Sequence, residues 1–219
     1  MKCYDIVSNN KDILVYLSQA DKNFAALGYT EQGIRHAKVT SSLVEKILSR
    51  LKFSEKEVDL AKTAAFVHDI GCAVAYKDHD QNGSMIVYNI LSKLDIEKKD
   101  LFTILSLISA HEDLQTVVLS ELASAITIAD KSDVLRERVK KSDFKLFDKH
   151  DTVHYAVIKN DIDILPQRNT LVLELTIDTS ICSVLDYFEI FMSRVNFCKV
   201  AANKLRLNFD FYINKVKYL

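Results

Sequence analysis

Apolar residues recur at helical spacing along the first two-thirds of the chain. Between about Asn10 and Leu27 they follow this spacing, and Gly28 is a natural helix stop. Ser54 with Glu57 makes a capping box, which predicts another helix start. The predicted helices run, in approximate bounds, over Asn10–Leu27, Thr30–Arg50 with Thr30 as its cap, Ser54–Asp69, Gln81–Leu94, Lys98–His111 and Ser120–Lys131, the last with a polar extension to about Lys141. Only four glycines and one proline interrupt the sequence, so the pattern predicts an all-helical bundle.

The pattern changes after about residue 145. Two runs of apolar and β-branched residues flank the segment with the single proline, and a long helical pattern and a further apolar run follow. The predicted elements are strands at Val153–Ile158, Leu171–Ile177 and Leu207–Ile213, with a helix of about 24 residues that starts at Ser180 or Ser183. The fold class is therefore mainly α. We expect a helical domain over residues 1–145 and a small α+β unit (strand-strand-helix-strand) over residues 146–219.

Composition narrows the possible partners. The 219 residues include 29 basic and 30 acidic side chains, so no net charge draws the chain to polymeric nucleic acid or an anionic membrane. No apolar run reaches the roughly 18–20 residues that span a bilayer. The N-terminus lacks the features of a signal peptide, and the four scattered cysteines are typical of free thiols in a reducing compartment. We therefore expect a cytoplasmic protein.

Histidine and aspartate recur near the ends of the predicted helices. The positions are His36, the pair His68-Asp69, His79, His111 and Asp130. Imidazole combined with carboxylate suits a transition-metal ion. The His-Asp dipeptide alone is weak evidence for a metal site, because the chain contains three such dipeptides. The stronger evidence is the order of all six positions along the chain.

This set can be divided between two metal ions. His36, His68, Asp69 and Asp130 suffice for one, and His79 and His111 suggest a second ion with Asp69 as the bridge. The alternative interpretations are capping or surface roles, a solvated histidine at His79 and a buried structural histidine at His111. Four other residues also have simpler explanations: a small buried thiol for Cys72, a solvated linker for His150, a strand position for His154 and a core position for Phe191.

Several segments together resemble the HD-domain metal-dependent phosphohydrolases, over about residues 28–142. The matching segments are Gly28–Glu31, Arg35-His36, Ala64–Gly71, Asp78-His79, His111-Glu112 and Ala129–Val134. The resemblance implies a helical core with His36, His68, Asp69 and Asp130 around one divalent transition metal (Fe, Mn, Co, Ni or Zn), and His79 and His111 completing a second site. It also implies phosphate-binding residues near the last core helix, where Lys131, Arg136 and Arg138 are available.

Departures from the family narrow the options, and the order of the six positions resembles that of its binuclear members. The acidic pair after the His-Asp dipeptide, typical of guanosine tetraphosphate hydrolases, is replaced by Ile70–Val74, and no Gly-Tyr-Pro signature exists. The leading hypothesis is a phosphohydrolase in which a metal-bridging hydroxide, held partly by Asp69, attacks a small phosphorylated metabolite or nucleotide. The alternatives are a di-iron oxygenase with the same six ligands and a regulatory nucleotide-binding module. A homodimer is compatible with each.

Overall fold

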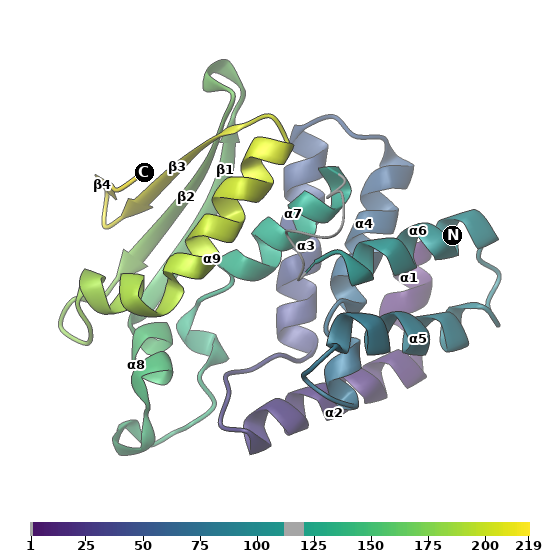
Figure 1. Cartoon of the computed structure of the whole chain (residues 1–219), viewed down its shortest axis with the longest axis horizontal. Coiled ribbons are helices and arrows are strands. Elements are labelled where there is room, and N and C mark those ends of the chain that lie inside the picture. The colour runs from purple at the N-terminus through teal and green to yellow at the C-terminus, as the bar shows by residue number, and fades with distance from the viewer. Residues whose placement is uncertain (1, 112–120) are drawn as a thin grey trace.

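The computed structural model describes residues 2–111 and 121–219. Glu112 and Ser120, which belong to the sequence predictions, lie outside these ranges. Within them the protein is mainly helical, with a small sheet near the C-terminus, as predicted (Figure 1). The helices of the first unit are α1 (Cys3–Ser8), α2 (Lys11–Ala26), α3 (Ile34–Arg50), α4 (Glu55–Val67), α5 (His79–Leu91), α6 (Lys98–Ser109) and α7 (Glu121–Ser132), with 3-10 turns at Ile70–Ala73, Arg136–Arg138 and Phe144–Leu146.

Side chains near the N-termini of α3 and α4 determine where these two helices begin. Ser54 and Glu57 form the predicted capping box of α4. Helix α3, however, does not begin at Thr30; it begins at Ile34 with Gly33 as its cap. The Glu31 carboxylate accepts hydrogen bonds from the backbone N–H of Gly33 at 2.7 Å and of His36 at 3.4 Å. The first turn of α3 therefore receives its acceptor from an upstream side chain, because Gly33 has none of its own.

The C-terminal unit contains two more helices and four strands. They are α8 (Lys149–Ala156), β1 (Val157–Leu165), a 3-10 turn at Pro166–Arg168, β2 (Thr170–Ile177), α9 (Val184–Lys204), β3 (Asn208–Ile213) and β4 (Val216–Lys217). The sheet order is β1-β2-β3-β4, with β2 and β3 parallel and the other neighbouring pairs antiparallel. Helix α9 makes the crossover between β2 and β3 and lies along the sheet (Figure 1).

The strand predicted at Val153–Ile158 was wrong over its first four residues. Asp148 and Asp151 form a capping box that starts α8, so the chain stays helical to Ala156 and β1 begins at Val157. Alternating apolar residues at the end of a short helix resemble a strand in sequence. The short strand β4 was also not predicted. The strand at 171–177, the long helix and the strand at 207–213 are present within a few residues of the predicted bounds.

The two units share one apolar core. Its buried side chains run from Val7 in α1 to Ile213 in β3, and α9 packs against α7. The Asn160 side chain donates a hydrogen bond to the carbonyl of Ser132, and the Cys198 thiol contacts the Ile128 carbonyl at 3.9 Å. The sheet unit is thus fixed against the helix that carries Asp130, while the predicted division near residue 145 stays a prediction.

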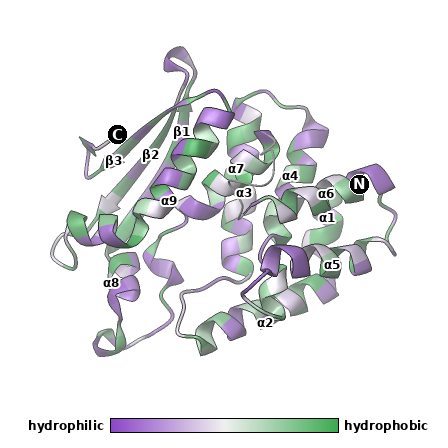
Figure 2. Ribbon diagram, viewed as in Figure 1, coloured by the Kyte–Doolittle hydropathy of each residue, from purple (hydrophilic) through white to green (hydrophobic). Residues whose placement is uncertain are grey.

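Hydrophobic and hydrophilic residues are interspersed around the helices of both units (Figure 2). Apolar side chains such as Val44, Phe66 and Ile126 are fully buried between the helices. This burial is the main favourable contribution to a fold of this kind. In the described part of the chain, no helix combines the length and apolar character that crossing a bilayer requires.

Candidate metal centre

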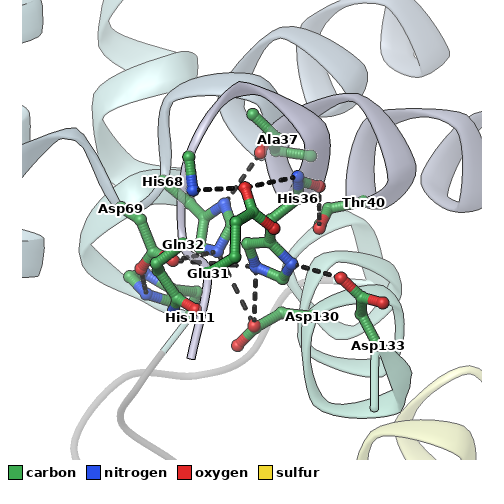
Figure 3. Close-up of polar contacts among 12 residues, drawn as sticks. Glu31, Gln32, His36, Ala37, Thr40, His68, Asp69, His111, Asp130 and Asp133 are labelled. Atoms are coloured by element: carbon green, nitrogen blue, oxygen red, sulfur yellow. Dashed lines mark hydrogen bonds and ion pairs between the residues drawn. The ribbon is translucent and has the colours of Figure 1, made fainter. Parts of the chain in front are cut away.

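Four of the predicted ligands converge in the interior of the bundle (Figure 3). His36 comes from the first turn of α3, His68 and Asp69 follow α4, and Asp130 lies near the end of α7. Each is at most 4% exposed. His36 Nε2 lies 3.3 Å from Asp130 Oδ1, and His68 Nε2 lies 3.1 Å from Asp69 Oδ2. One ligand atom from each residue lies within 4.8 Å of all the others, so the four could hold a metal ion.

The other two predicted histidines lie on the opposite side of Asp69. Its Oδ1 is 3.4 Å from His79 Nε2 and 3.8 Å from His111 Nε2, and these two nitrogens are 3.2 Å apart. Its Oδ2 faces His36 and His68 instead, at 3.7 and 3.1 Å. One carboxylate therefore presents a different oxygen to each pair of imidazoles. This is the arrangement expected of a bridging ligand.

The second ring nitrogen of each histidine has a hydrogen-bond acceptor. Nδ1 of His68, His79 and His111 lies 2.8, 2.9 and 2.6 Å from the carbonyl oxygen three residues earlier in the chain. A carbonyl can only accept, so Nδ1 carries the proton in each case. His36 Nδ1 lies 2.7 Å from Asp133 Oδ2. Every ring is therefore oriented with Nε2, the nitrogen left available to a metal ion, toward the centre.

The inward-facing atoms fit a cation. His36 Nε2, His68 Nε2 and Asp69 Oδ2 are buried and have no hydrogen-bond partner in the described part of the chain. Leaving a buried polar atom unpaired costs about 1–3 kcal/mol, so such atoms imply a bound group that satisfies them. Burial alone would raise the pKa of Asp69, but the imidazoles around the carboxylate, His68 first among them, hold that pKa well below its ordinary value. The donor set is thus imidazole nitrogen and ionised carboxylate, which suits a divalent transition metal.

Comparison with known proteins agrees with this geometry. The family model for the HD domain matches residues 33–135, a stretch that encloses all six predicted ligands. This part of the chain is an HD domain. Proteins with an HD domain are generally metal-dependent hydrolases. Among curated proteins, none matches this chain closely enough to count as a relative.

Asp133 is a residue of the HD-domain centre that the sequence interpretation missed. Its side chain is fully buried, and Oδ2 accepts hydrogen bonds from His36 Nδ1 and, at 2.9 Å, from Arg35 Nη2. Burial would raise the pKa of Asp133, but the bond from His36 and the charges of Arg138 and Arg35 lower it strongly, so it is ionised. The sequence held a signal, because Asp133 follows Asp130 by one helical turn.

We predict that Asp133→Asn weakens metal binding at the His36 site by about 10- to 100-fold, the usual effect of losing a carboxylate that orients a ligating histidine. Asparagine keeps the size and one acceptor oxygen but removes the charge that the His36 ring faces. Competition with a chelator of known affinity measures the change. Asp161→Asn, which changes an exposed carboxylate on β1 that pairs with Lys159, is the matched control. Equal affinities for both variants would contradict the orienting role of Asp133.

The HD-domain centre borders a cavity of about 410 Å³. Asp69, His79 and Asp130 line it together with residues of α2, α8 and α9. A volume of this size suits a small organic ligand. The C-terminal unit therefore shapes the space next to the candidate metal ligands.

The three basic residues proposed for phosphate binding lie in different places. Lys131 lines the cavity, with its Nζ 2.7 Å from Asp130 Oδ2. Arg138 also lines it, but its fully buried guanidinium donates to the carbonyls of Glu31 and Asp133 and to the Gln32 side chain. The Arg136 guanidinium lies 5.0 Å from the ring centre of Tyr155. A direct contact with substrate is thus best supported for Lys131, and for the two arginines it stays a prediction.

Proposed function

We propose that this protein is a phosphohydrolase that uses two divalent transition-metal ions, such as Fe, Mn, Co, Ni or Zn. His36, His68, Asp69 and Asp130 would hold one ion, and His79 and His111 would hold the other with Asp69 shared between them. The observation that carries the proposal is the Asp69 carboxylate, whose two oxygens face two separate pairs of imidazole nitrogens. Paired ions of this kind are typical of enzymes that cleave phosphate esters and anhydrides.

When bound, such ions polarise a phosphoryl group and activate water for attack on phosphorus. The chain's own residues would prepare the site for this chemistry. Lys131 brings a positive charge to the cavity wall beside Asp130, where it would neutralise charge that develops on the phosphoryl oxygens. Arg138 would contribute indirectly, because its hydrogen bonds fix the backbone of Glu31 and Asp133. The cavity would admit a small phosphorylated metabolite or nucleotide.

Elemental analysis of protein purified without chelators tests the metal assignment. We expect about two metal atoms per chain, and about one in His79→Ala, since that variant removes a ligand of only one site. His150→Ala is the matched control, because His150 lines the same cavity but lies outside the ligand set. Absence of metal in wild-type protein, even after reconstitution, would overturn the proposal.

The reaction is tested by a screen for phosphate release with the same metal-loaded protein. Release from a small phosphate ester or anhydride, lost on chelation and restored by metal, is the expected result. Oxygen uptake with no phosphate release would instead indicate oxygenase chemistry at the same ligands and would defeat the hydrolase assignment.

The cellular setting is a further part of the proposal. The four cysteines are free thiols, three of them buried, which supports a reducing compartment such as the cytoplasm. A homodimer stays a prediction.

A further inference from the structure

Two side chains of the C-terminal unit line the cavity with unused hydrogen-bonding capacity. They are His154 on α8 and Arg194 on α9. His154 Nδ1 and Arg194 Nη1 are buried, and neither has a hydrogen-bond partner in the described part of the chain. Because a buried polar atom without a partner is costly, such a pair beside a cavity indicates groups that a ligand satisfies.

His154 offers an acceptor. The side chain is 2% exposed, and its ring packs 4.8 Å from the ring of Phe191. Burial and the nearby charges of Arg138 and Arg194 hold the pKa of His154 well below its ordinary value, so the ring is neutral at physiological pH. The backbone of Val134 is the hydrogen-bonding neighbour of this ring, and Nδ1 has no partner in the described part of the chain. A neutral ring that donates from Nε2 presents a lone pair at Nδ1.

Arg194 offers a charged donor. Its guanidinium lies 5.4 Å from the Phe191 ring centre, and the cavity wall there also includes Phe197. The other two cations of the cavity are engaged by the HD domain itself, Lys131 in its ion pair with Asp130 and Arg138 in its hydrogen bonds to the chain. An arginine with a buried, unpartnered N–H is a strong binding group for phosphate oxygens.

We propose that Arg194 and His154 form a second substrate-binding subsite, which takes an anionic group of phosphate type next to a hydroxyl. The arginine would bind the anion, and His154 Nδ1 would accept the hydrogen bond of the hydroxyl. The subsite belongs to the wall contributed by α8 and α9, whereas Asp69, His79 and Asp130 belong to the HD domain. The inference rests on the proposed function and deepens it: the substrate class becomes a phosphorylated polyol, sugar or nucleotide that carries a second phosphate.

Calorimetric titration of the metal-loaded full chain with inorganic phosphate tests the subsite directly. We expect about two phosphates per wild-type chain, one at the metal centre and one at Arg194, and about one in Arg194→Met. Lys199→Met is the matched control, because Lys199 is an exposed cation on the same helix and does not line the cavity. One phosphate in the wild type, or two in Arg194→Met, would overturn the subsite.

Kinetics separate this inference from the proposed function. With substrates that differ by one phosphate, Arg194→Met is expected to raise KM for the bisphosphate about 10- to 100-fold with kcat unchanged, and to leave KM for the monophosphate as it was. An unchanged KM for both substrates would defeat the subsite while the hydrolase stands. If no phosphate compound is cleaved but phosphate binding depends on Arg194, the subsite stands and the hydrolase assignment fails.

Discussion

Replacing Asp69 with alanine is expected to remove both metal ions and to lower kcat/KM by about 10³-fold or more. Among the described residues, Asp69 is the one whose carboxylate faces both pairs of imidazoles. Its loss removes a ligand from each site at once and the negative charge that the two ions would share. Without it, four histidines and Asp130 remain, a set that carries too little charge to hold two divalent ions close together.

Metal content, turnover and helical content are measured on the same Asp69→Ala preparation. The helical content should stay close to that of the wild type, because the helices are held by the apolar core and not by Asp69. Asp95→Ala is the control: Asp95 is an exposed carboxylate in the loop between α5 and α6, and its removal should change none of the three quantities. Wild-type turnover by Asp69→Ala with verified metal content would show that the reaction does not use this centre.

The helices and the six candidate metal ligands could be identified because both are recorded in local sequence. Helix capping at Ser54 and the apolar spacing depend on residues a few positions apart. These signals can therefore be recognised without knowledge of tertiary contacts. The candidate ligands stand at or near helix ends, which capping and apolar spacing locate. Thr30 failed as a cap because the acceptor came from a neighbouring side chain, Glu31, which propensity alone does not distinguish.

The acceptor that orients His36 and the lining of the cavity depend on contacts between distant segments. Asp133 orients His36 across 97 positions, and its spacing of one helical turn from Asp130 does not by itself reveal that it pairs with His36. Phe191 was interpreted as core and His154 as a strand residue, yet both also line the cavity, because α9 and α8 pack beside the metal ligands. A sequence pattern indicates that a side chain is buried. It does not indicate whether the space next to it is filled or open.

Replacing Gly71 with alanine is expected to disrupt the second metal site and spare the first. A β-carbon at this position would lie 2.5 Å from the Gly83 nitrogen and 2.7 Å from the carbonyl carbon of His79, so the backbone of α5 would have to move away. In the proposed assignment His79 would bind the second ion alone, whereas the first ion would be held by His36 and His68, which come from α3 and the end of α4. The displacement should cost about 1–3 kcal/mol of folding free energy, as overpacking usually does.

We therefore expect Gly71→Ala to bind about one metal atom per chain and to turn over about 10²-fold more slowly, since a shift of about 1 Å in a catalytic group has effects of this size. Gly83→Ala is the matched control from the same contact: its β-carbon would lie 3.3 Å from the Gly71 nitrogen, a distance that small adjustments accommodate. Urea unfolding, metal content and turnover distinguish the cases. Two tightly bound metals and full activity in Gly71→Ala would mean that His79 is not held by this contact, and the second site would then have to be assigned to other residues.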